Sequence, residues 1–135
     1  MKRDLLETDY VKRFLVKATL DIPWITFFRR NTGLVTMADG RKFRASLPGQ
    51  CDTYGIRHGD ARHFELEFKR FTKLSPDQER WRDNCLARGW PWLCLGVERG
   101  EDPKDTVAGW VGGVRAWTQP TAYGSPPAGR GTEAP

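Results

Sequence analysis

Apolar and charged residues alternate between positions 62 and 69, in the segment RHFELEFK. Phe64, Leu66 and Phe68 are separated by single residues, so in an extended chain they point to one face. The opposite face carries three charged side chains: Glu65, Glu67 and Lys69. The pattern predicts a strand with one buried face. Its charged face is either a solvated surface or part of a metal site.

A shorter segment with strand character precedes it, from 52 to 56, and a tight turn over 57–60 joins the two. Antiparallel pairing of the two strands brings Asp52 beside the end of the longer strand, which carries Glu67 and Lys69. Metal-assisted hydrolysis of a phosphodiester requires hard carboxylate oxygens beside a positively charged group. The spacing is compatible with such a site at this end of the hairpin, with a solvated surface as the alternative.

The spacing of apolar residues predicts a first helix over 5–20. Pro23 ends it, because proline cannot continue a helix and biases the residue before it away from helical angles. Glu7 borders the apolar face in the first turn, where a carboxylate also interacts favourably with the helix dipole. The expected buried stripe consists of Leu6, Tyr10, Val11, Phe14, Leu15 and Ala18.

A second helix is predicted from 76 to 88, because Ser75 is a good N-cap, Pro76 a favourable first residue and Gly89 a stop. The apolar run 92–97 then predicts a buried strand. Strand, helix and strand form a βαβ unit, so strands 62–69 and 92–97 are expected to be parallel neighbours. The start of the helix then lies near Lys69, and Gln78 in its first turn can reach the same site.

The remaining segments are predicted from turn signals and spacing. A strand is expected over 24–30, and Asp39-Gly40 indicates a hairpin between strands 34–37 and 42–45. Residues 105–117 have helical spacing, but three glycines weaken that prediction. Proline and glycine dominate the end of the chain, which predicts a disordered tail. We therefore expect one domain over 1–117 and a tail over 118–135.

Composition limits the class of protein. The 135 residues suffice for one domain with a modest core. No apolar run approaches the roughly 20 residues of a membrane span, and the N-terminus lacks the apolar region of a signal peptide, so a soluble cytoplasmic protein is expected. Three cysteines without a CxxC pair argue against a zinc site or a disulfide framework and favour a reducing compartment.

The net charge of +5 is concentrated in the first 50 residues, which hold ten Lys or Arg against five Asp or Glu. A basic face of this kind attracts phosphate backbones, although it is equally consistent with a solvated surface.

The order of these motifs resembles the PD-(D/E)xK nuclease superfamily, and more narrowly the small stand-alone VRR-NUC nucleases of phages and bacteria. The resemblance rests on segments 49–52 (GQCD), 67–69 (EFK) and 74–78 (LSPDQ), with 30–33 (RNTG) upstream, and it covers roughly residues 7–97. The chain departs from the family at Cys51, where proline or a small residue commonly precedes the acid. A buried thiol can fill that space.

The resemblance implies an α/β fold with a restriction-endonuclease-like core, in which helices flank a mixed central sheet. It implies that Asp52 and Glu67 bind Mg²⁺ or Mn²⁺ together with the backbone carbonyl of Phe68. Lys69 and Gln78 are the further catalytic residues that the family pattern suggests. No other small-molecule cofactor is expected.

Several residues keep more than one interpretation. The glutamate that such nucleases often carry on the first helix corresponds by position to Glu7, which is otherwise a helix-dipole residue. Glu65 lies roughly 7 Å from Glu67 along the strand and either faces solvent, supports the site from behind or binds a second metal. Four residues are expected to contact nucleic acid: Arg30, Asn31, Arg70 and Lys73. The alternative for Arg30 is a solvated side chain, and the alternative for Asn31 is turn formation.

Three functions remain open. The first is a metal-dependent endonuclease selective for branched or junction DNA, acting as a homodimer in the cytoplasm of a bacterial or phage-infected cell, as the family resemblance implies. The second is a nonspecific or restriction-type DNA nuclease. The third is an inactive nuclease fold that only binds DNA, although a binding module has no need of two acids in a groove meant for phosphate.

Overall fold

The computed structural model describes residues 5–30, 34–44 and 47–120. The expectations for Asn31 and for the tail beyond 120 lie outside these residues. The elements follow in the order α1 (Glu7–Asp21), β1 (Ile25–Arg29), β2 (Leu34–Thr36), β3 (Lys42–Arg44), β4 (Thr53–Arg57), β5 (His63–Arg70), α2 (Pro76–Ala87), β6 (Trp92–Val97) and α3 (Pro103–Thr118).

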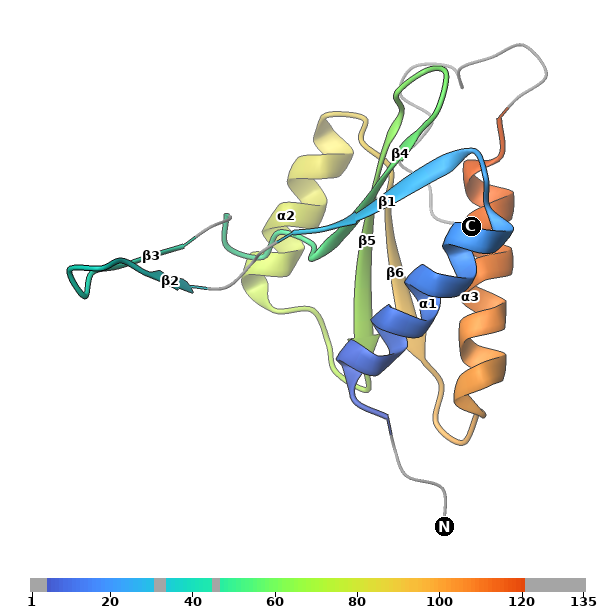
Figure 1. The fold of residues 1–135 in the computed structure, drawn as a ribbon, viewed down its shortest axis with the longest axis horizontal. Helices are drawn as coiled ribbons and strands as arrows, with labels where there is room; N and C mark the ends of the chain where they lie inside the picture. Colours follow the sequence, from blue (N-terminus) through green and yellow to red (C-terminus); the bar gives the residue numbers. More distant parts are fainter. Residues whose placement is uncertain (1–4, 31–33, 45–46, 121–135) are drawn as a thin grey trace.

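One mixed sheet organises the molecule, with strand order β1-β4-β5-β6 (Figure 1). β1 pairs antiparallel with β4, and β4 pairs antiparallel with β5 through the predicted hairpin. β5 and β6 are parallel neighbours joined by α2, which confirms the βαβ unit. The protein is therefore a small single-domain α/β fold with a four-stranded mixed sheet and three helices among its described residues.

The alternation in β5 separates two packing layers. Phe64, Leu66 and Phe68 join the main core, which α1 and α3 complete on one face of the sheet. Phe14 of α1 is fully buried there, and its ring makes edge contacts with Phe27 at 5.6 Å and Phe68 at 5.3 Å. A second, smaller cluster lies under α2 on the opposite face and consists of Cys51, Trp81, Cys85 and Trp92.

The first helix matches its predicted range closely, but one member of the expected stripe is wrong. Leu6 is 61% exposed, whereas Tyr10, Val11, Phe14 and Ala18 are buried. Leu6 is the N-cap residue with an extended backbone. It therefore precedes the first helical turn and does not share the face that the helical spacing assigned to it.

The Asp39-Gly40 turn forms the predicted hairpin of β2 and β3. Gly40 has a φ of 86°, a left-handed conformation that glycine adopts without strain. In Figure 1 this hairpin projects from the body of the molecule, on the stretch of chain between β1 and β4.

The last helix is longer than its glycines suggested. Asp102 caps α3 by accepting a hydrogen bond from the Lys104 backbone N–H at 2.9 Å. Val107, Trp110, Val111 and Val114 are buried, and the helix packs along α1. Packing of this apolar face outweighs the low helix propensity of glycine. No helix within the described segments is both long and apolar enough to span a membrane.

Candidate active site on strand β5

The register of the β4–β5 hairpin brings the predicted acids together. Thr53 pairs with Leu66, so Asp52 and Glu67 come one residue beyond the last pair on adjacent strands. β5 continues to Arg70 without β4 as a partner. The backbone of Phe68, the predicted carbonyl ligand, therefore lies in a part of β5 that β4 does not pair with.

Glu67 is the centre of this site. Its side chain is buried, with 8% of the residue exposed, and Gln78 Nε2 donates a hydrogen bond to Glu67 Oε1 at 3.2 Å. Burial raises the pKa of Glu67 to about 7, against the lowering effects of a hydrogen bond with Cys51 and of the Lys69 charge. The charges of Glu7 and Asp52 raise it further. The pKa of Glu67 is thus affected by the charges of Lys69, Glu7 and Asp52, the three groups that the sequence analysis assigned to this site.

This raised pKa predicts how stability depends on pH in the absence of metal. Because the folded pKa of Glu67 is about 7 and the model value is 4.5, the folded state binds this proton more tightly than the unfolded chain. The resulting stabilisation is present below about pH 4.5 and is lost as pH rises through 7. We expect the unfolding free energy to fall from pH 5 to pH 8, relative to Glu67→Gln, by on the order of 2–3 kcal/mol.

Urea unfolding at several pH values in EDTA measures this difference. Glu67→Gln is the matched control, since it removes the titration while keeping the shape of the side chain. Parallel pH profiles for the two proteins would contradict the expectation.

Gln78 reaches Glu67 because α2 begins with a capping box. The Ser75 backbone N–H donates to Gln78 Oε1 at 2.9 Å, and the Gln78 backbone N–H donates to Ser75 Oγ at 3.2 Å. The amide oxygen is thus held by the cap, which leaves its Nε2 facing Glu67. The sequence predicted both the cap and the proximity, and the structure joins them in one side chain.

Gly49 allows the loop before Asp52 to pass directly over the start of α2. Its φ is 77°, and a Cβ on this residue would lie 2.1 Å from the Asp77 backbone oxygen. The loop that carries Asp52 and the helix that carries Gln78 are therefore in contact at a point where only glycine fits.

We expect Gly49→Ala to lower the unfolding free energy by about 2 kcal/mol or more, because it adds a backbone clash to a left-handed conformation. Gly100→Ala is the matched control, since Gly100 has a φ of 79° with no atom within 4 Å of the added Cβ. It isolates the conformational cost, about 1 kcal/mol. Urea unfolding of the two variants gives the comparison, and equal losses would rule out the clash.

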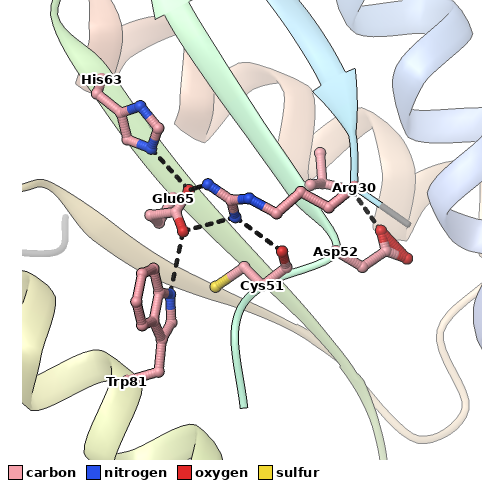
Figure 2. Close-up of polar contacts among 7 residues, drawn as sticks. Arg30, Cys51, Asp52, His63, Glu65 and Trp81 are labelled. Atoms are coloured by element: carbon pink, nitrogen blue, oxygen red, sulfur yellow. Dashed lines mark hydrogen bonds and ion pairs between the residues drawn. The ribbon is translucent and has the colours of Figure 1, made fainter. Parts of the chain in front are cut away.

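Glu65, next to Glu67 on the same face of β5, is fully buried, so the interpretation in which it faces solvent is wrong. Its carboxylate accepts two hydrogen bonds from the Arg30 guanidinium, at 2.7 and 2.9 Å (Figure 2). Trp81 Nε1 donates to it at 3.0 Å, and His63 Nε2 lies 2.8 Å away. We call these four residues the Glu65 network.

Arg30 therefore differs from the expected phosphate contact. Its side chain is only 16% exposed, and Nη1 also donates to the Cys51 carbonyl at 2.8 Å. Its backbone N–H donates to the Asp52 carbonyl at 2.6 Å. Both contacts hold the segment that carries Asp52. Arg30 thus supports this segment, and its guanidinium pairs with Glu65.

Sequence reasoning missed Arg29, the neighbour of Arg30. Its Nη2 forms an ion pair with Asp52 Oδ2 at 3.0 Å, and both side chains are more than a third exposed. Thr53 Oγ1 donates to the other carboxylate oxygen of Asp52 at 3.2 Å. The sequence did contain a signal for this contact. Adjacent residues of an extended chain point to opposite faces, so Arg29 and Arg30 are expected to have different partners.

The other predicted residues lie at the open end of β5. Lys69 is half-buried and has no hydrogen-bond or ion-pair partner among the described residues. Arg70 follows it at the end of β5 with its guanidinium 5.1 Å from the Phe71 ring centre, and Lys73 is exposed in the loop before α2. Glu7, at the first turn of α1, is exposed.

The residues present suit a small divalent cation only if water and substrate complete its ligands. Within the described ranges, no three His, Cys, Asp or Glu side chains are arranged to hold a metal ion. Mg²⁺, however, is commonly bound by one or two carboxylates with waters and phosphate oxygens. Asp52, Glu67 and a backbone carbonyl provide such a set. The buried Glu67 carboxyl, with its raised pKa, is a group that a nearby cation would stabilise in its charged form.

No protein-family model matches the chain, and no curated protein matches it either.

Proposed function

We propose that the protein is a Mg²⁺- or Mn²⁺-dependent endonuclease of PD-(D/E)xK type that hydrolyses phosphodiester bonds of DNA. One observation carries the proposal. A buried acid on a central strand, Glu67, accepts a hydrogen bond from Gln78 and lies in the field of charged neighbours. Burial raises its pKa, the charge of Lys69 lowers it, and the charges of Glu7 and Asp52 raise it further. A structural carboxylate would be expected to have a full set of hydrogen bonds or a dedicated ion pair, as Glu65 has.

The chain's own groups suit phosphodiester hydrolysis. Asp52 and Glu67 would hold a divalent cation, which when bound polarises the scissile phosphate and lowers the pKa of a water ligand. Lys69, unpaired among the described residues, is available to orient the attacking water or to stabilise charge on the phosphate oxygens. Gln78 holds the Glu67 carboxylate in one orientation. Arg70 at the end of β5 and Lys73 in the exposed loop before α2 would contact phosphates of the bound strand.

Branched or junction DNA is the substrate that we propose, acted on by a homodimer whose two sites nick two strands of a two-fold symmetric junction. The family resemblance supports this part of the proposal. The basic residues of the first 50 positions support nucleic acid as the partner.

A cleavage assay tests the function. End-labelled four-way junction, flap, single-stranded and linear duplex DNA are incubated with Mg²⁺, Mn²⁺ or EDTA. Metal-dependent cutting of the branched substrates in preference to the duplex is expected. Equal cutting of plain duplex would replace the proposal with a general nuclease. Binding without cutting under either metal would leave a DNA-binding protein with a nuclease-like fold.

Metal binding has its own prediction, independent of activity. We expect Mg²⁺ at millimolar concentration to raise the thermal unfolding midpoint more at pH 8 than at pH 6. The cation and the proton compete for Glu67, whose pKa of about 7 lies between the two pH values. Differential scanning fluorimetry measures the shift, and Glu67→Gln should lose most of it. An equal shift in both proteins would place Mg²⁺ elsewhere.

A further inference from the structure

Four rings form a row across the sheet face that carries Glu65 and Glu67. Phe28 of β1 stacks on Tyr54 of β4 at 5.1 Å, and Tyr54 stacks on His63 of β5 at 5.2 Å. His63 in turn lies 5.5 Å from Trp90, in the loop between α2 and β6. The separations are typical of favourable ring pairs. We call Phe28, Tyr54, His63 and Trp90 the aromatic ladder.

The two ends of the ladder differ. At one end, the guanidinium of Arg88 covers Trp90 at 5.4 Å. Within the ladder, the guanidinium of Arg30 lies 4.3 Å from the centre of Tyr54. Phe28 stands at the other end, on an edge strand of the sheet, and is 41% exposed. Among the described residues, neither a cation nor a ring other than Tyr54 stacks on it. The ladder thus ends in one exposed aromatic side chain that a further flat ring can extend.

This open end is close to the proposed catalytic acid. Phe28 pairs with Tyr54. Two residues from this pair, just beyond the ends of β1 and β4, the Arg30 backbone N–H donates to the Asp52 carbonyl at 2.6 Å. Two residues of a strand span about 7 Å, which is about the rise of two stacked nucleotides at 3.4 Å each.

We propose that Phe28 stacks on an unpaired base of the bound DNA, one or two nucleotides from the phosphate that is cut. A nucleobase is the occupant that these observations favour, because every base offers a flat π face to an aromatic side chain. A base inside an intact duplex has both faces covered by its neighbours, whereas an unpaired nucleotide that leaves the stack has a free face. The inference rests on the proposed nuclease function and deepens it: Phe28 would select DNA with single-stranded nucleotides, such as a flap or an open junction.

The test measures binding in EDTA, so that no cleavage occurs. The probes are a forked DNA and a single strand, each with 2-aminopurine in the unpaired region, and a blunt duplex of the same length. Wild type, Phe28→Ala and Phe28→Trp are compared, with Leu20→Ala as the control. Leu20 is a strongly exposed apolar residue of α1, the helix that covers the opposite sheet face. Thermal unfolding of each variant verifies that it is folded.

We expect Phe28→Ala to weaken binding of the forked and single-stranded probes by about 5- to 150-fold, the range for losing one base–aromatic stack. Blunt-duplex affinity should change less than about twofold, Phe28→Trp should retain binding and the quenching of 2-aminopurine, and Leu20→Ala should match wild type. No loss in Phe28→Ala, or an equal loss on all three probes, would overturn the stacking role while leaving the nuclease proposal intact. Failure of wild type to bind any probe would also overturn the stacking role, and the cleavage assay with Mg²⁺ or Mn²⁺ then decides the nuclease proposal separately.

Discussion

Glu67→Gln should abolish metal-dependent DNA cleavage while making the protein more stable than wild type at pH 8. The glutamine keeps the shape of the side chain and an oxygen that can accept from Gln78 Nε2, but it cannot carry the negative charge. At pH 8 the wild-type carboxyl, with its pKa of about 7, is largely ionised inside the protein, and the substitution removes that cost. We expect cleavage to fall by at least about 10²–10³-fold, the usual effect of removing one strongly acting polar group from an active site.

Lys69→Met should cause a similar loss of cleavage, because Lys69 is the positive side chain nearest to Glu67 along β5. Glu67→Gln removes a negative charge and Lys69→Met removes a positive one. If net charge alone mattered, the first substitution would strengthen DNA binding and the second would weaken it. If both residues act in catalysis, the cleavage rate falls in both variants. Single-turnover cleavage with protein in excess separates the rate from affinity.

Glu79→Gln, an exposed residue of α2 close in sequence to the site, is the control and should cleave at the wild-type rate. Cleavage by Glu67→Gln within about tenfold of wild type would exclude Glu67 from the chemistry.

The parts of this site that were predictable from the sequence are those set by local pattern. The period-two alternation in β5 separated Phe64, Leu66 and Phe68 from the charged residues, and the short turn fixed the hairpin register that brings Asp52 to Glu67. The Ser75 cap fixed where α2 begins and therefore where Gln78 lies. Each of these inferences needed only residues within one supersecondary unit.

The errors concern contacts between distant segments. Glu65 and Glu67 both lie on the charged face of β5, so the alternation of residues does not distinguish them. Only their contacts with other segments of the chain do. Arg30 directly follows β1 and lies 35 residues away, and Trp81 comes from α2, 16 residues away. A glutamate is seldom fully buried unless it is paired, and no local pattern names its pair. The hydrogen bond from Arg30 Nη1 to the Cys51 carbonyl also joins distant segments, and no local pattern predicts it.

Arg30→Met is expected to be the most destabilising of these substitutions, at about 3–5 kcal/mol of unfolding free energy. It leaves the Glu65 carboxylate fully buried without its cation, and removing one partner of a buried ion pair costs this much. The exposed pair Lys17–Asp21 is the matched control. Its N–O distance of 2.8 Å is close to the 2.7 Å of Arg30–Glu65, but its side chains are 45% and 42% exposed. Lys17→Met should therefore cost less than about 1 kcal/mol.

A second substitution tests whether the uncompensated charge is the cause. Glu65→Gln in the Arg30→Met background removes the buried charge while keeping an oxygen for Trp81 Nε1, so it should recover roughly half of the lost stability. Urea unfolding of the four proteins of this cycle measures the coupling between the two side chains. If the double variant is as unstable as Arg30→Met alone, the loss comes from the hydrogen bond that Arg30 Nη1 donates to the Cys51 carbonyl, because the backbone N–H that contacts Asp52 is kept in the variant. In that case the Arg30 side chain would act mainly as a support for the segment that precedes Asp52.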